Sequence, residues 1–139
     1  MPSSFAIGET NLPELQAAMA CDKAGAQVDF VGLVRNHNHG RAVTALEYVA
    51  YQNLAETEGA RILSEAAARF ALHAVLASHR VGLLKVGDVA VRVSVAASHR
   101  HDAFAACRWV IDEIKSRLPI WKREYYSDGS SEWTAPCSD

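Results

Sequence analysis

The sequence has few cysteines and no long run of apolar residues. Its three cysteines, Cys21, Cys107 and Cys137, are far apart and lack CxxC spacing, so neither a disulfide framework nor a zinc site is expected. No apolar stretch approaches the roughly 20 residues that a membrane-spanning helix needs. The first residues, MPSSFAIGETNLPEL, contain no recognisable export or import signal. We therefore expect a cytoplasmic protein that does not attach to a membrane.

Strong net charge and the common nucleotide-binding motifs are also missing. The net charge is only −2, which argues against a general nucleic-acid binder. There is no GxGxxG fingerprint, P-loop or GxSxG elbow, so dinucleotide redox chemistry, nucleotide hydrolysis and α/β-hydrolase chemistry lack support. Because 139 residues, half of them apolar, suffice for one core, we expect a single domain over residues 1–139.

The spacing of the apolar residues predicts an α+β domain. Helices are expected over residues 10–25, 54–72 and 101–118. Strands are expected over residues 26–35, 43–51, 74–82 and 89–98, and a C-terminal hairpin over residues 120–126 and 131–136. The first two strands, joined by the polar loop NHNHGRA, are interpreted as another hairpin.

Two lysines flank Pro119 in the stretch KSRLPIWKRE. Lys115 falls at the border of the apolar face of the last expected helix. In an extended strand, Lys122 and Glu124 share one face while Arg123 lies on the other. Lysines at a helix end often only complement the helix dipole and stay solvated. A lysine held near another cation or against apolar walls can instead serve as a proton donor or nucleophile, and two would bind a phosphate.

The stretch SHRHD lies where the strand of alternating valines runs into the last helix. Free amides at a helix start favour an anion, and His99 and Arg100 would add donors and charge there. The competing interpretation is a simple helix cap by Ser98 or Asp102. Capping does not explain the adjacent histidine and arginine, so this junction is a candidate anion site.

Alternating histidines occur in the stretch VRNHNHGR. No nearby Cys, Asp or Glu completes a ligand set, so we expect no metal and interpret His37 and His39 as part of a polar turn. Arg35, at the end of the preceding strand, is better placed to hold an anion. Together, the three clusters favour a cationic pocket for a small anionic substrate.

The segments FVGLVRNHNHG, LEYVAY, VGDVAVRVSVAASHRHDAF and KSRLPIWKRE resemble, in order and spacing, those of the large, catalytic subunit of molybdopterin synthase. The similarity covers about residues 26–136. It implies an α/β hammerhead-type single domain with an antiparallel sheet, flanking helices and a C-terminal hairpin. It also implies a sulfurtransferase of molybdenum-cofactor biosynthesis, which inserts two sulfurs into cyclic pyranopterin monophosphate to form the molybdopterin dithiolene.

The same resemblance implies a partner and an assembly. The sulfur would arrive as the C-terminal glycine thiocarboxylate of a small, ubiquitin-like subunit, whose tail would enter the pocket of the large subunit. Two large subunits would form a homodimer at the centre of a heterotetramer. Neither a cofactor nor a metal is expected for this step, because molybdenum enters later in the pathway.

The resemblance also assigns the site. Its matching segments contain the catalytic residues Lys115 and Lys122. The residues expected to bind the substrate are Arg35, His99, Arg100, Lys115, Lys122 and Arg123. Lys115 is expected to act in proton transfer or transient covalent attachment. Lys122 is expected to position the substrate and stabilise developing negative charge.

Two functions of other classes remain as alternatives. A non-catalytic module that binds a phosphorylated ligand or a ubiquitin-like tail would use the same cationic pocket but show no turnover. A weak single-stranded RNA binder using Trp121, Arg123 and Tyr125 would lose affinity steeply with added salt. The acidic total charge argues against the second alternative.

Overall fold

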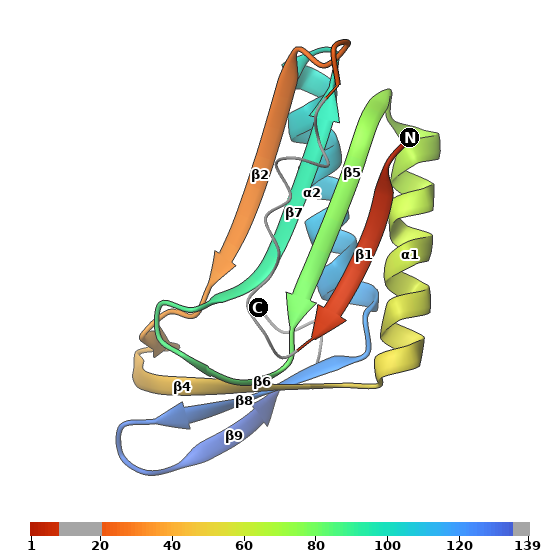
Figure 1. Ribbon diagram of the computed structural model, residues 1–139. Coiled ribbons are helices and arrows are strands. Elements are labelled where there is room, and N and C mark those ends of the chain that lie inside the picture. Colours follow the sequence, from red (N-terminus) through yellow and green to blue (C-terminus); the bar gives the residue numbers. More distant parts are fainter. Residues whose placement is uncertain (9–20, 135–139) are drawn as a thin grey trace.

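The computed structural model describes residues 1–8 and 21–134. Its elements follow the order β1 (Ser3–Gly8), β2 (Ala26–Leu33), β3 (His37–Asn38), β4 (Arg41–Ala50), α1 (Gln52–Arg69), β5 (Leu72–Arg80), β6 (Gly82–Lys85), β7 (Val89–Ala97), α2 (Arg100–Arg117), β8 (Ile120–Tyr126) and β9 (Ser131–Thr134). They form two sheets that share a boundary at the end of α2 (Figure 1).

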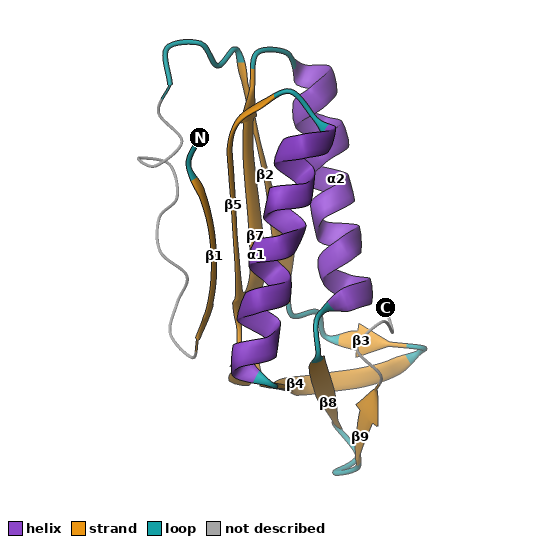
Figure 2. Ribbon diagram, turned by 90° about the vertical axis from the view of Figure 1, so that its right-hand side faces the viewer, coloured by secondary structure: helices purple, strands orange, loops and turns teal. Residues whose placement is uncertain are grey.

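The first sheet has the strand order β1-β5-β7-β2, and α1 and α2 lie together on one of its faces (Figure 2). The core between these layers consists of helix residues such as Ile62 and Val110 and of Val91, Val93 and Val95 from β7. These valines alternate along the strand, so their side chains point to the same face of the sheet. Burial of this shared apolar face holds the helices on the sheet.

The second sheet has the order β3-β4-β8-β9, with β6 also paired to β4. It lies across the end of the first sheet where α2 ends (Figure 1). Pro119 follows the helix, and Leu118 before it is extended, with φ −74° and ψ 135°, as expected for a residue that precedes proline. The chain therefore leaves α2 and enters β8 almost at once.

Helix α1 is fixed against both β1 and α2. A Cβ atom at Gly59 would collide with the ring of Phe5, so glycine permits the close approach of helix and strand. Arg117 of α2 donates hydrogen bonds to Glu58, at 2.5 Å and 2.9 Å, and to Glu65 at 2.6 Å. These contacts hold the last turn of α2 in place.

The structure confirms the α+β class and most of the expected elements. The helices expected over 54–72 and 101–118 correspond to α1 and α2, and the C-terminal hairpin corresponds to β8 and β9. The strands expected over 74–82 and 89–98 correspond to β5 and β7, which pair antiparallel.

The hairpin expected between residues 26–35 and 43–51 is wrong. The two strands form, as β2 and β4, but β2 pairs with β7 whereas β4 pairs with β6 and β8. A bulge at Gly32 and Leu33 ends the regular pairing of β2, and the short hairpin of β3 and β4 follows, with positive φ at His39 and Gly40. The polar loop therefore carries the chain from one sheet to the other.

Two further differences concern the N-terminal region. Strand β1 was not predicted, and it pairs in parallel with β5, whereas the other strand pairs are antiparallel as expected. The helix expected over residues 10–25 lies largely outside the described residues. Its last part, residues 21–25, forms a turn in which the Ala24 amide donates to the Cys21 carbonyl.

Candidate active site

A cleft of about 320 Å³ is lined by residues of both sheets and of α2. One side is apolar and includes Phe30, Val31 and Leu33 of β2. The polar and charged groups in the lining are Arg35, His37, Asn38, Tyr48, Lys115, Lys122 and Glu124. A pocket of this size with a few convergent polar groups suits a small ligand.

The cleft brings together the two lysines that flank Pro119. Lys115 lies in the last turn of α2, and Lys122 lies on β8 directly opposite Tyr48 of β4. Both lysines line the cleft. The turn at Pro119 makes this convergence possible, because it allows a helix and a strand to approach one space from different directions.

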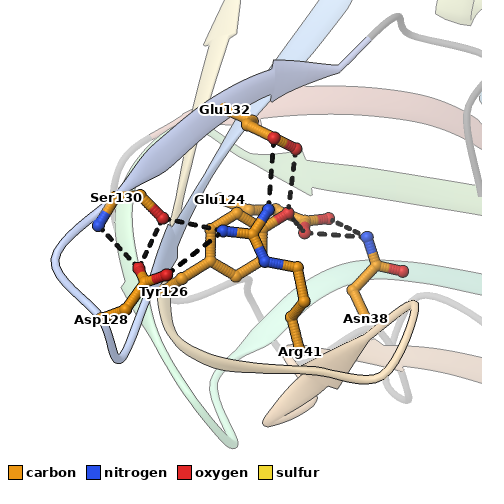
Figure 3. A network of polar contacts seen from close by, with 7 residues as sticks. All are labelled: Asn38, Arg41, Glu124, Tyr126, Asp128, Ser130 and Glu132. Carbon is orange, nitrogen blue, oxygen red and sulfur yellow. Dashed lines mark hydrogen bonds and ion pairs between the residues drawn. The ribbon is translucent and has the colours of Figure 1, made fainter.

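Lys122 is paired with a buried carboxylate. Its Nζ lies 3.3 Å from Oε1 of Glu124, whose side chain is only 2% exposed. Asn38 Nδ2 donates to both carboxylate oxygens, at 2.9 Å and 2.8 Å, and the Tyr126 hydroxyl donates to Oε2 at 2.9 Å (Figure 3). Burial by itself raises the pKa of Glu124, but these hydrogen bonds and the lysine charge outweigh it and lower the pKa below its ordinary value.

Lys115 lies near two rings that stay neutral at pH 7, the buried His79 and the partly buried Tyr48. Burial, with a contribution from Glu124, raises the pKa of Tyr48 to about 12. Burial also lowers the pKa of His79 to about 4, and the charge of Lys115 adds to this effect. His79 Nδ1 donates to the Arg80 carbonyl at 2.6 Å, which fixes the neutral tautomer. The ring centroids of Tyr48 and His79 are 4.9 Å apart, edge to face.

Arg35 joins the same network through Asn38. Its Nη2 donates to Asn38 Oδ1 at 3.2 Å, so the amide of Asn38 connects the guanidinium to the carboxylate of Glu124. The structure thus brings Arg35, Lys115 and Lys122 to one cleft, as the sequence predicts. Three cationic side chains around one buried carboxylate can bind an anion and stabilise negative charge as it develops.

His99 and Arg100 lie elsewhere in this chain. His99 is the residue before α2, and Arg100 begins that helix. From Arg100 to Lys115 the helix extends about 22 Å along its axis, so these residues do not line the same cleft. Arg100 instead lines a separate exposed hollow with Phe104 and Arg108.

Arg123 also faces away from the cleft, because neighbouring residues of a strand point to opposite faces. Its guanidinium lies over the rings of Tyr125 and Trp133, at 5.0 Å and 5.8 Å, and its Nε donates to Ser131 Oγ at 3.0 Å. The expectation that Arg123 binds the substrate together with Lys122 finds no support in this geometry.

Sequence reasoning missed three polar residues around the lysines: Asn38, Tyr48 and Glu124. The signal for Glu124 was present, because period-two alternation in IWKREYY places it on the same face as Lys122. The other two residues come from β3 and β4, and their approach to β8 depends on long-range pairing that the sequence does not display.

Within residues 1–8 and 21–134, no group of three or more His, Cys, Asp or Glu side chains is placed to hold a metal ion. None of the helices described there combines the length and the apolar character needed to cross a membrane.

The sequence and the fold match those of known proteins. The molybdopterin synthase catalytic subunit of Pyrococcus abyssi is 44% identical over 119 residues, which span 86% of this chain and 80% of that protein. The crystal structure of molybdopterin synthase from Staphylococcus aureus gives a TM-score of 0.86 at 34% identity, with 93% of this chain and 95% of that chain covered.

A more distant structure shares the fold. It is a chain of the protein–protein complex of subunits 1 and 2 of molybdopterin-converting factor from Helicobacter pylori, with a TM-score of 0.71 at 20% identity over 96% of this chain and 88% of that chain. The family model described as MoaE protein matches residues 8–117, which is most of the chain. The resemblance of the sequence segments is therefore confirmed, and this chain belongs to the MoaE protein family.

Proposed function

We propose that this protein is the catalytic large subunit of molybdopterin synthase. It transfers sulfur from a thiocarboxylated, ubiquitin-like small subunit to cyclic pyranopterin monophosphate, and so forms the molybdopterin dithiolene in the cytoplasm. The observation that carries the proposal is the convergence of Arg35, Lys115 and Lys122 in one cleft. The name of the Pyrococcus abyssi relative supports the activity, and the two-subunit complex from Helicobacter pylori supports a small-subunit partner.

The charges of the cleft suit both reactants. The substrate carries a phosphate and the donor carries a thiocarboxylate, so each brings negative charge to a space lined by three cationic side chains. Arg35 and Lys122 hold anionic groups, and Lys122 stabilises negative charge that develops during transfer. Lys115, placed beside neutral rings, acts in proton transfer or transient covalent attachment.

A second copy of the chain supplies His99 and Arg100 in this proposal. Both are too far along α2 to serve the cleft of their own chain. Exposed apolar side chains lie beside each part of the divided site: Phe104 near Arg100, and Leu33 at the cleft. Such side chains are typical of surfaces that another chain covers. We propose, as the resemblance implies, that the assembly is a homodimer at the centre of a heterotetramer.

The activity is tested by mass-spectrometric detection of molybdopterin. The protein is mixed with cyclic pyranopterin monophosphate and thiocarboxylated small subunit. We expect product from the wild type and from Lys85→Ala, a control lysine that is exposed on β6. Lys115→Ala is expected to lose on the order of 10² to 10⁴ in rate, the usual contribution of a positioned proton-transfer group.

Two results would contradict the assignment. A folded wild type that binds the small subunit but forms no product would favour the non-catalytic binding module. Full turnover by Lys115→Ala would remove that lysine from the chemistry while leaving the overall reaction in place.

Mixing two inactive variants tests the shared pocket. If His99 acts across the dimer, hybrids of His99→Ala and Lys115→Ala chains contain one pocket with both residues intact. Random mixing should then restore about a quarter of wild-type activity, because half the dimers are hybrids and each has one working pocket. Stable dimers that regain no activity on subunit exchange would contradict the shared pocket.

A further inference from the structure

Glu124 is an unusual residue for the interior of a small protein. Its side chain is only 2% exposed. Glu124 lies on β8 and pairs with Leu46 of β4. A buried carboxylate is costly unless cations and hydrogen-bond donors compensate for its lost hydration, and an apolar residue of similar size is often at least as stable. Such a group is therefore a candidate for a role other than stability.

The hydrogen bonds of Glu124 orient its carboxylate, and its ion pair is formed with Lys122 on the cleft side. Asn38 donates to both oxygens, and Tyr126 donates to Oε2. These donors are neutral, so they fix the orientation of the carboxylate without cancelling its charge. Lys122, at 3.3 Å from Oε1, provides the ion pair on the cleft side.

Tyr126 is itself held in place by Arg41, which packs against its ring. The Arg41 guanidinium lies 3.5 Å from the centre of its ring and donates to Ser130 Oγ at 2.8 Å and Glu132 at 3.2 Å (Figure 3). Burial, followed by the hydrogen bond to Glu124 and then by the negative charge of that carboxylate, raises the pKa of Tyr126. The phenol therefore remains protonated and keeps donating to the carboxylate.

The surroundings of Lys122 make this carboxylate necessary. The titratable or charged groups that line the cleft with Lys122 are Arg35, His37, Tyr48, Lys115 and Glu124. Among the described residues of that lining, only Glu124 is a carboxylate. Arg35 and Lys115 are cationic and line the same cleft, so they repel the ammonium of Lys122, and the long, flexible side chain of a lysine can move away from like charge.

We infer that Glu124 is a positioning residue: it holds Lys122 as a fixed ammonium that points into the cleft, while Asn38 and Tyr126 set the angle of the carboxylate. This inference rests on the proposed sulfur-transfer function. In it, Lys122 contributes permanent positive charge toward the anionic reactants, and Glu124 touches neither reactant. Such preorganised charge stabilises a transition state more than a mobile side chain does.

The test compares the kcat of Glu124→Gln, alone and in a Lys122→Ala background, with that of Glu132→Gln. Both glutamate changes remove one negative charge from the network of Tyr126, but Glu132 is exposed and pairs with Arg41 rather than Lys122. For Glu124→Gln alone we expect kcat to fall on the order of 10-fold to 100-fold. In the Lys122→Ala background the same change should lower kcat little further, because a residue that acts through Lys122 then has nothing to position. Glu132→Gln should keep the wild-type kcat.

A second pair of variants keeps the test valid if Glu124→Gln does not fold. Arginine keeps the positive charge and can pair with the carboxylate of Glu124, so Lys122→Arg should retain more turnover than Lys122→Gln. Equal turnover of those two variants, or an undiminished effect of Glu124→Gln in the Lys122→Ala background, with an active wild type, would overturn the inference. An inactive wild type would instead contradict the proposed function, so the two failures are distinguishable.

Discussion

Acidification should destabilise this protein through one buried imidazole. His79 is 4% exposed, on β5, and its Nδ1 donates to the Arg80 carbonyl. Burial, together with nearby Lys115, lowers the pKa of His79 from 6.5 to about 4 in the folded chain. In the unfolded chain the imidazole returns to its ordinary pKa of about 6.5.

The sign follows from proton binding. Between pH 6.5 and pH 4 the unfolded chain binds a proton at His79 that the folded chain does not, so stability rises with pH across this window. The contribution is fully present above pH 6.5 and is lost as the pH falls to about 4. At about 1.4 kcal/mol per unit, the loss is about 2 kcal/mol at pH 5 and about 3 kcal/mol below pH 4.

The assay is urea unfolding of wild type and His79→Asn at several pH values from 7.5 to 4.5. The asparagine amide can replace the Nδ1 donor but does not titrate. The variant loses the contact with the Tyr48 ring and starts from a lower stability, so the informative quantity is the change with pH. The free energy of unfolding should fall by about 2 kcal/mol more in the wild type than in the variant between pH 7.5 and pH 5.

The titration of carboxylates does not change the difference in pH dependence between wild type and His79→Asn. Glu124 and Asp128 have lowered pKa values, so each contributes stability that is present above its unfolded pKa and lost as the pH falls through its folded pKa. That loss is shared by both proteins and occurs at the acid end of the range. Parallel pH dependence of the two proteins down to pH 5 would refute the reasoning, because it would mean that His79 accepts its proton in the folded state.

The remaining predictions concern the helices. Arg117→Met should lower the melting temperature and reduce the free energy of unfolding by about 1 to 2 kcal/mol, because its three carboxylate partners lose charged hydrogen bonds. Its control, Arg108→Met, removes an exposed ion pair and should leave the melting curve unchanged. Ile62→Ala should cost about 2 to 5 kcal/mol in urea unfolding, since Ile62 is fully buried. The exposed Leu54, changed to alanine, serves as its control, and equal losses at the two positions would contradict the assignment of the core.

Local patterns in the sequence were sufficient for the elements but not for all their partners. The valines of β7 and the apolar stripe of α2 have clear periods, so both elements were predicted with correct types. The partners of β2 and β4 are set by contacts distant in sequence, and adjacency along the chain favoured the wrong hairpin. Strand β1, SSFAIG, has few β-branched residues and gave no local signal.

The candidate site shows the same division. Arg35, Lys115 and Lys122 were predicted and do meet in one cleft. His99 and Arg100 were assigned to the site because their segment matches that of the family. Such a match does not tell whether the residues of one pocket come from one chain or from two. The helix length already separated Arg100 from Lys115 by about 22 Å, so spacing alone could have shown that one chain does not bring them together.

The break at Pro119 explains why the chain separates its two lysines by seven residues. In an uninterrupted helix, Lys115 and Lys122 would share a face but stand about 10 Å apart along the axis, with flexible side chains exposed to solvent. Because α2 ends and β8 begins within three residues, one lysine is anchored on a helix and the other on a strand. The strand adds Glu124 two positions later on the same face. A helix–proline–strand sequence can therefore place two cations in one small cleft, together with the carboxylate that positions one of them.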